Sequence, residues 1–237
     1  MVRKIFTMSF DDNTVQDERF IELIDKYNLR ATFNINTATF GRKHNIIHEG
    51  IDVCHDDLEA EKVKYLYRNH EVALHTHSHP NLKRCDDERI VSEIKQNYDI
   101  LTELTGKEII GMAYPCGGDC YDERVMQVIT DCSPVRYART TNSHHTFAFP
   151  ENFMAWHPTC HQNDAALMEL ADKFIAAEPE EDILFYLWGH TFEFDKFGSW
   201  ESFERFCEKI ASRLDITYMT NGEVYRYVMK KRNLHSL

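Results

Sequence analysis

Short runs of apolar and β-branched residues alternate with longer amphipathic segments along most of the chain. The short runs have the length and composition of buried strands. They predict strands at residues 5–10, 31–36, 72–75, 109–114, 135–139, 153–157, 183–188 and 216–219. The longer segments have apolar residues every three or four positions, which is typical of helices packed on one face. They predict helices at residues 17–27, 58–68, 87–104, 122–130, 165–176, 200–214 and 222–231.

Helix boundary signals support this assignment. Asp86 and Asp87 stand before a helical apolar pattern that begins at Ile90, and Gly106 follows it as a C-cap. Regular strand–helix alternation predicts parallel strands covered by helices. We therefore expect an α/β fold, a (β/α) barrel with seven or eight parallel strands, formed by one domain over residues 1–237. Periodicity alone does not separate a barrel from an open doubly wound sheet. In a barrel, the active site lies at the carboxyl ends of the strands.

Composition narrows the function classes. The 237 residues carry 27 Lys and Arg against 39 Asp and Glu, a net charge of −12 that opposes binding to nucleic acid. Apolar stretches are far shorter than the roughly 20 residues of a membrane span, and no signal peptide is evident. Seven cysteines form no CxxC pair, which favours a reducing compartment. We expect a cytoplasmic protein. Its 13 histidines direct attention to a metal or acid–base site.

Two predicted strands end in groups suited to a metal. The first ends in Asp11 and Asp12, and adjacent carboxylates repel each other unless a cation lies beside them. The third continues into His75, His77 and His79. Only a turn after His75 allows two of these histidines to share one ion, and in a helical turn His75 and His79 would be the pair. The alternatives are a helix N-cap for the aspartates and a surface histidine run without a ligand.

Other strand ends supply candidates for catalysis. The segment from Tyr114 to Gly118 predicts a tight turn whose amides could hold an oxyanion, or an ordinary βα turn. Cys116 has no base nearby in the sequence, which argues against a nucleophile. His190 ends the predicted strand at 183–188, and Arg139 ends another, where it could orient a carboxylate or form a plain salt bridge. A metal bound by Asp12, His75 and His79, with Asp11 as base and His190 as acid, would hydrolyse an amide or ester without a covalent intermediate.

These motifs resemble those of the polysaccharide deacetylases of carbohydrate esterase family four, also called the NodB homology domain. SFDD at 9–12, HTHSH at 75–79 and LWGH at 187–190 occur in the family's order, and TNGEVYRY at 220–227 is similar to its C-terminal segment. The resemblance implies a distorted (β/α) barrel. It implies Asp11 as catalytic base, His190 as general acid, and Leu187 in the pocket for the acetyl methyl group. It also implies that Asp12, His75 and His79 bind the metal.

The chain departs from the family pattern at three motifs. AYPCG at 113–117 has Ala113 where the family has an arginine that positions the base, and Arg139 is our candidate substitute. Tyr114 and Cys116 belong to this motif, and the resemblance assigns an oxyanion-binding backbone amide to Cys116. No clear counterpart of the fourth motif is present, although Trp156 could supply its hydrophobic part. The aspartate expected after the final histidine is Thr191.

The leading hypothesis is a metal-dependent deacetylase that removes acetyl groups from an N- or O-acetylated carbohydrate. An Asp-His-His site accepts zinc, cobalt, nickel or iron, and zinc is our first expectation. A second hypothesis is a hydrolase of a cyclic amide or another small non-sugar amide on the same fold. A third is a catalytically silent barrel that binds a carbohydrate. We expect no nucleic-acid or membrane partner.

Overall fold

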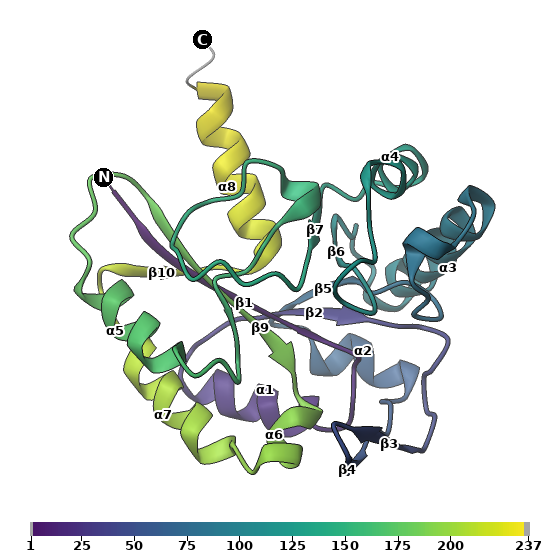
Figure 1. The fold of residues 1–237 in the computed structure, drawn as a ribbon, viewed down its shortest axis with the longest axis horizontal. Coiled ribbons are helices and arrows are strands. Elements are labelled where there is room, and N and C mark those ends of the chain that lie inside the picture. The colour runs from purple at the N-terminus through teal and green to yellow at the C-terminus, as the bar shows by residue number, and fades with distance from the viewer. Residues whose placement is uncertain (1, 235–237) are drawn as a thin grey trace.

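A parallel sheet of eight strands forms the centre of the computed structural model, which describes residues 2–234 (Figure 1). The strand order is β7-β6-β5-β2-β1-β9-β8, and β10 pairs with the amino-terminal half of β1. All pairs in this sheet are parallel. The strands are β1 (Lys4–Asp11), β2 (Thr32–Ile35), β5 (Glu71–Leu74), β6 (Gly111–Ala113), β7 (Tyr137–Arg139), β8 (Cys160–His161), β9 (Ile183–His190) and β10 (Ile216–Tyr218).

The sheet curves into a distorted (β/α) barrel, as the sequence predicts. Its two edge strands, β7 and β8, are linked by one irregular segment. Trp156 pairs with Arg139 of β7 in an isolated parallel bridge, and Cys160 pairs with Leu187 of β9. The backbone of residues 156–161 thereby bridges the gap between the two edges.

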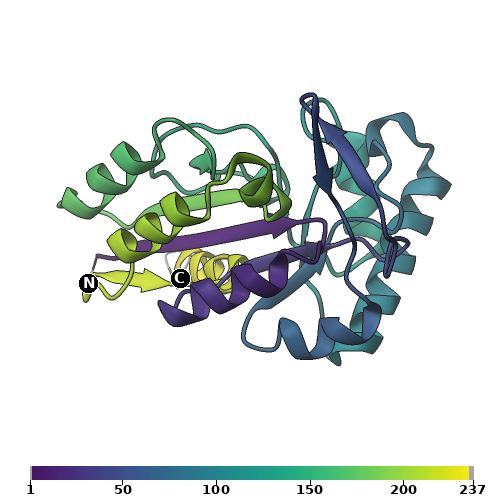
Figure 2. The ribbon, with the colours of Figure 1, turned by 90° about the horizontal axis from the view of Figure 1, so that it is seen from below.

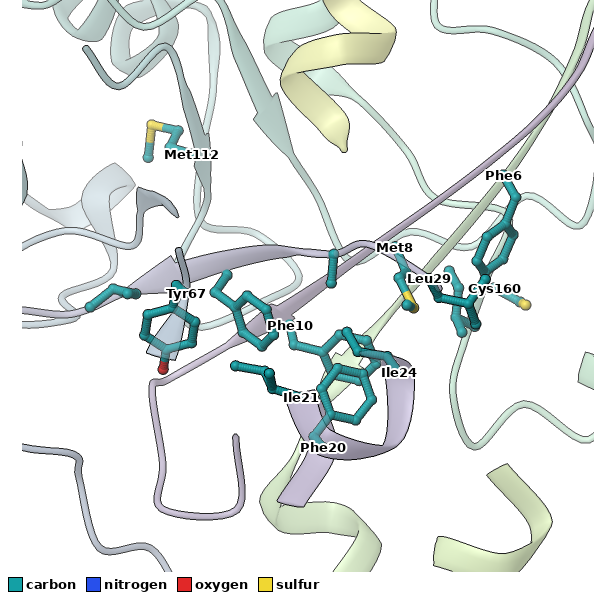
Figure 3. Close-up of a cluster of buried hydrophobic side chains, with 14 of the residues drawn as sticks. Phe6, Met8, Phe10, Phe20, Ile21, Ile24, Leu29, Tyr67, Met112 and Cys160 are labelled. Carbon is teal, nitrogen blue, oxygen red and sulfur yellow. The ribbon is translucent and has the colours of Figure 1, made fainter. Parts of the chain in front are cut away.

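Helices cover the outside of the sheet, except that the last of them contributes Val224 and Val228 to the smaller cluster on the inner face. They are α1 (Asp17–Lys26), α2 (Ala60–Leu66), α3 (Asp87–Thr105), α4 (Glu123–Cys132), α5 (Leu167–Ala176), α6 (Phe192–Phe197), α7 (Trp200–Ile210) and α8 (Asn221–Leu234). Alternate residues of β1 face the two sides of the sheet. Phe6, Met8 and Phe10 pack against helices in the larger core, where Phe10 and Phe20 have ring centroids 4.1 Å apart (Figure 3). Ile5 belongs to a smaller cluster inside the barrel.

One predicted strand is wrong. Residues 153–157 contain a short 3-10 helix, η2 (Phe153–Ala155), and the next strand, β8, begins only at Cys160. The Asn152 side chain accepts a hydrogen bond from the Met154 amide, which stabilises the start of the turn. The aromatic residues that suggested a strand are buried although the backbone forms a turn. Phe153 and Trp156 pack against each other with ring centroids 5.0 Å apart.

A hairpin, one helix and a short 3-10 helix, η1 (Leu82–Arg84), are additional to the predicted elements. An antiparallel hairpin, β3 (Asn45–His48) and β4 (Ile51–Cys54), turns through Glu49 and Gly50, which both have positive φ angles. Helix α6 begins two residues after His190. The hairpin stands at the end of the barrel towards which β1 points (Figure 2). Of the helices in residues 2–234, none combines the length and apolarity that crossing a bilayer requires.

Candidate active site

The end of β1 places two carboxylates at the mouth of the barrel. Strand register sets Asp11 directly beside Asn34 of β2 and His190 of β9. Asp12 follows with a φ of 79°. A residue directly after Asp11 would point to the opposite face if the strand continued. The left-handed backbone at Asp12 ends the strand, and both carboxylates line the same cavity.

The loop after β5 brings His75 and His79 together without a helical turn, so the expected helical geometry is wrong. Thr76 and His79 have φ angles of 67° and 59°, and these two left-handed residues fold the loop back on itself. The two imidazole centroids lie 4.9 Å apart. His77 points elsewhere, with its Nδ1 2.9 Å from the Thr37 hydroxyl.

Buried polar side chains of α3 fix this loop. Asn97 accepts a hydrogen bond from the His75 amide at 3.0 Å. Glu93, which is 1% exposed, accepts from both the amide and the hydroxyl of Ser78, at 2.7 and 2.6 Å. Because these groups are buried and paired, we infer that the histidines are held in place before any ligand binds.

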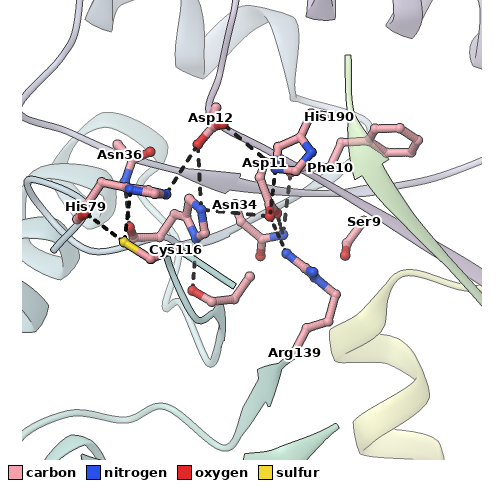
Figure 4. Close-up of polar contacts among 12 residues, drawn as sticks. Ser9, Phe10, Asp11, Asp12, Asn34, Asn36, His79, Cys116, Arg139 and His190 are labelled. Atoms are coloured by element: carbon pink, nitrogen blue, oxygen red, sulfur yellow. Dashed lines mark hydrogen bonds and ion pairs between the residues drawn. The ribbon is translucent and has the colours of Figure 1, made fainter. Parts of the chain in front are cut away.

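Asp12, His75 and His79 form a set that fits a divalent cation. Their donor atoms lie within 4.8 Å of one another. Asp12 Oδ1 is 3.6 Å from His75 Nε2 and 3.8 Å from His79 Nε2 (Figure 4). Metal–ligand bonds of about 2.1 Å place tetrahedral ligand atoms roughly 3.4 Å apart, so a small adjustment suffices. His75 Nδ1 lies 2.9 Å from the Ala113 carbonyl, an arrangement that leaves Nε2 as the metal-facing atom.

The protonation states suit the same set. Burial lowers the pKa of His75 to about 4, so its ring is neutral and able to ligate. Burial raises the pKa of Asp12, but the neighbouring His55, His190 and His75 outweigh that effect and hold it well below its ordinary value. Three protein ligands leave positions for water, as in catalytic zinc sites.

Arg139 holds the other carboxylate. Its guanidinium pairs with Asp11 Oδ2, and Asn34 donates to Asp11 Oδ1 at 2.8 Å. Arg139 is fully buried and lies over the Trp188 ring at 4.4 Å from the centroid. Burial raises the pKa of Asp11, but the charge of Arg139 and the neighbouring His75 and His190 rings outweigh that effect and lower the pKa below its ordinary value. Asp11 is therefore ionised at neutral pH.

His190 faces Asp11 and Asp12 from the end of β9. Its Nε2 lies 3.9 Å from Asp11 Oδ2 and 3.9 Å from Asp12 Oδ2, and its Nδ1 lies 3.3 Å from Glu193 Oε1. Burial opposes the charged ring, but Glu193, Asp12 and Asp11 outweigh it and raise the pKa of His190 to about 9. Glu193 also lies 3.3 Å from His161 Nε2 and accepts a 2.6 Å hydrogen bond from Asn163.

One cavity of about 530 Å³ is lined by Asp11, Asp12, His75, His79 and His190. Tyr114 and Cys116 line it, as do Trp188 and Phe192. Cys116, with a φ of 68°, puts its sulfur 3.4 Å from the His79 carbonyl and 3.7 Å from His79 Nδ1. The Tyr114 hydroxyl donates to the Met154 carbonyl at 2.8 Å, so this tyrosine supports the wall and points its hydroxyl away from the metal set.

Two predicted pocket residues lie elsewhere. Leu187 is on the face of β9 opposite His190, fully buried among the helices, because successive side chains of a strand alternate in direction. Trp188 is the β9 residue that lines the cavity. Trp156 is buried deeper in the barrel, against Tyr186 with ring centroids 4.7 Å apart, and is absent from the lining formed by the described residues.

Three residues of the site escaped the sequence analysis. Glu193 is three residues from His190, so a helix beginning after β9 would have indicated it. Asn34 is found only from the register between β1 and β2. His55 follows the hairpin, and its Nε2 lies 3.6 Å from Asp12 Oδ2. Its contact with Asp12 depends on tertiary packing that no local pattern signals.

The fold and the site define a (β/α) barrel with a candidate metal centre at the carboxyl ends of its strands. The sequence profile of polysaccharide deacetylases matches residues 2–134, more than half of the chain. The chain therefore belongs to the polysaccharide deacetylase family. No curated protein matches it in sequence.

Solved structures share the fold. A Mycobacterium smegmatis protein assigned as a polysaccharide deacetylase is 15% identical, with a TM-score of 0.68 over 98% of this chain and 92% of that one. The Streptococcus pyogenes deacetylase PplD, solved with acetate, is 20% identical, with a TM-score of 0.53 over 64% of this chain and 62% of that one. A Bacillus anthracis pseudoenzyme of carbohydrate esterase family four is 15% identical, with a TM-score of 0.53 over 88% and 60%. This chain thus spans less than two thirds of the latter two proteins.

Proposed function

We propose that the chain is a metal-dependent deacetylase that hydrolyses acetyl groups on an N- or O-acetylated carbohydrate. One observation carries the proposal: a single cavity is lined by a set of metal-ligating side chains and, next to it, by an ionised carboxylate and a histidine. A barrel that only bound a sugar would have no need to bury this many charges together, since each costs free energy to desolvate.

Asp11 is the base in this proposal. Its Oδ2 lies 3.8 Å from His75 Nε2, so the carboxylate borders the metal set without belonging to it. Arg139 and Asn34 hold both of its oxygens. These contacts keep it ionised and fixed in orientation, which a general base requires.

His190 is the acid. Its ring nitrogen Nε2 faces the cavity while Nδ1 faces Glu193. A carboxylate on Nδ1 keeps a proton there and stabilises the charged ring, so Nε2 can deliver its proton to a departing amine or alcohol. The family pattern has an aspartate directly after this histidine, where this chain has Thr191. The Thr191 hydroxyl donates to Asp17, and Glu193 supplies the carboxylate beside His190.

A divalent cation held by Asp12, His75 and His79 would acidify a water molecule and polarise the acetyl carbonyl. The Cys116 amide, in a turn with three consecutive left-handed residues from Cys116 to Gly118, is the proposed additional donor to the oxyanion. A main-chain donor tolerates cysteine in place of tyrosine at this position.

Acetate release from acetylated oligosaccharides tests the proposal. The native protein should release acetate, and chelation should abolish the activity until zinc is restored. Asp11→Asn should lower turnover by about 100-fold or more because the base is lost, while the bound metal is retained. Asp99→Asn, on the exposed face of α3, is the matched control.

Three results would contradict parts of this account. Near-normal turnover in Asp11→Asn would refute the assignment of the base. Activity on cyclic ureides, together with none on acetylated sugars, would show that the site serves a small amide. Absence of both activities in metal-loaded protein would favour a silent carbohydrate-binding barrel.

A further inference from the structure

A second group of metal-ligating side chains lies beside the first. His44, His55 and Asp57 offer donor atoms within 4.8 Å of one another. His44 Nδ1 is 3.8 Å from Asp57 Oδ2, and the two imidazole centroids are 5.1 Å apart. All three residues line the same 530 Å³ cavity as the first set, so an ion could reach them from solvent.

The β3–β4 hairpin holds this group in place. The amide of His55 donates to the His44 carbonyl at 2.9 Å, and the amide of Asp57 donates to the Arg42 carbonyl at 2.9 Å. The two segments that flank the hairpin therefore run side by side, which sets their side chains on one surface. Asp57 is 1% exposed, and Thr39 donates to its Oδ1 at 3.0 Å.

Both histidines carry a buried ring nitrogen that lacks a hydrogen-bond partner within residues 2–234. These atoms are Nδ1 of His44 and Nδ1 of His55. His55 is 9% exposed. Leaving a buried polar atom without a partner costs free energy, and two such atoms on neighbouring rings beside a buried carboxylate require an explanation.

We propose that His44, His55 and Asp57 bind a second divalent cation of the zinc class. Two imidazole nitrogens and one carboxylate oxygen form a donor set that zinc-like ions prefer, and an ion would give both orphaned nitrogens a partner. The site is distinct from Asp12, His75 and His79, and it does not depend on the proposed deacetylase activity.

His55 would connect the two sites. Its Nε2 lies 3.6 Å from Asp12 Oδ2. A neutral imidazole carries one proton, so a cation on Nδ1 requires the proton on Nε2, where it is directed at Asp12. That contact occupies Oδ2 and leaves Oδ1, the oxygen nearer His75 and His79, for the first cation. The second cation thus orients a ligand of the first.

Arg42 competes with this second cation. Its Nε lies 3.2 Å from Asp57 Oδ2, and its side chain is 52% exposed. Asp57 is buried but Arg42 is not, so the guanidinium can move into solvent when a cation takes its place beside the carboxylate. Removing the arginine should therefore strengthen the second site, whereas removing a ligand should abolish it.

Metal counting tests the proposal. The full chain is equilibrated with buffered Zn²⁺ alone, and bound zinc is measured by elemental analysis. The native protein should bind two equivalents. His44→Gln and Asp57→Asn should each bind one, with the second affinity reduced by at least about 100-fold, because even outer-shell losses cost 10–100-fold. Arg42→Gln should bind two, the second more tightly.

Two further variants separate this proposal from the proposed function. His79→Ala removes a ligand of the first set and should also leave one equivalent. His145→Ala removes an exposed histidine paired with Asp164 and should leave two. One equivalent in the native protein, unchanged in both His44→Gln and Asp57→Asn, would overturn the second site and leave the deacetylase proposal intact. If His44→Gln lost one equivalent of zinc and His79→Ala lost none, the second site would stand and the metal set of the deacetylase proposal would be refuted. Circular dichroism verifies that each variant is folded.

Discussion

Asp11, Asp12 and Asp17 differ in what balances their charge. Asp11 has Arg139, and Asp12 has four histidines within 4 Å of its carboxylate. Asp17 accepts hydrogen bonds from two hydroxyls, those of Tyr67 and Thr191, each at 2.6 Å. Burial therefore raises the pKa of Asp17 to about 7, while the pKa values of the other two are lowered. The partners of each carboxyl group therefore decide whether it is ionised at neutral pH.

Arg139 is expected to be necessary for turnover. Arg139→Met would leave Asp11 buried without a counter-charge, which raises its pKa and disables it as a base. Turnover should fall by about 100-fold or more, and the free energy of unfolding should fall by about 3 kcal/mol. Steady-state kinetics and urea denaturation measure the two effects. Arg136→Met, on an exposed side chain nearby, is the control, and equal behaviour of the two variants would contradict this role.

Asp17 should make stability depend on pH. Between pH 3.8 and about 7 the unfolded chain releases the Asp17 proton while the folded protein keeps it. Stability contributed by this residue therefore falls as pH rises through that window, and the full loss is present above it. Asp17→Asn mimics the protonated form and removes the loss. Its stability relative to the native protein should rise by up to about 4 kcal/mol from pH 4 to pH 8.5.

Urea denaturation at several pH values measures this difference. The exposed Asp99→Asn serves again as the control, since it replaces a carboxylate without removing a buried charge. A gap between Asp17→Asn and the native protein that stayed constant across the pH range would show that Asp17 is ionised in the folded state.

At the scale of elements, the short strands of the barrel depend on close packing. Gly111 begins β6 and pairs with Tyr137 of β7. A Cβ at this position would overlap the Tyr137 ring, which is fully buried inside the barrel. Gly111→Ala should therefore lower the free energy of unfolding by about 3 kcal/mol.

A double variant verifies the cause. Tyr137→Leu creates space, so Gly111→Ala should cost much less when introduced beside it. Thermal or urea unfolding of the two single variants and the double variant gives the coupling. Additive effects would show that the alanine acts through the backbone of β6 and not through the tyrosine.

Most of the alternating elements could be predicted from the sequence, because helical periodicity and short apolar runs report directly on burial. The hairpin could not: β3 and β4 are largely exposed, so they lack the apolar run that marked the others. The strand predicted at residues 153–157 is wrong for the opposite reason. The segment has buried aromatic side chains, as a strand would, but its backbone forms a 3-10 turn.

The candidate site could be predicted only where a motif lies at a strand end. Asp11, Asp12 and His190 satisfy that condition and lie together. Leu187 does not line the cavity, because its neighbour Trp188 shares the face of His190. Contacts between side chains of different elements, such as that of Glu193 with His161, follow from packing that a single sequence does not express.

At the scale of the whole molecule, the parallel topology explains why distant residues meet. The ends of β1, β5, β7 and β9 lie at one mouth of the barrel, and they deliver Asp12, His75, Arg139 and His190 to it. These positions are far apart in the chain. The ends of β1, β5 and β9 are adjacent or nearly adjacent in the sheet, whereas β7 is at its edge and Arg139 reaches Asp11 because the sheet curves. A cation shared by the β1 and β5 ends would cross-link two strands separated by β2.

The central claim is that Asp12, His75 and His79 converge on one divalent cation. Anomalous diffraction at the zinc edge, from crystals of the full chain grown with zinc, tests it directly. The account predicts a peak about 2.0–2.2 Å from one oxygen of Asp12 and from Nε2 of both histidines. A fully loaded crystal with no peak between these three side chains would contradict it.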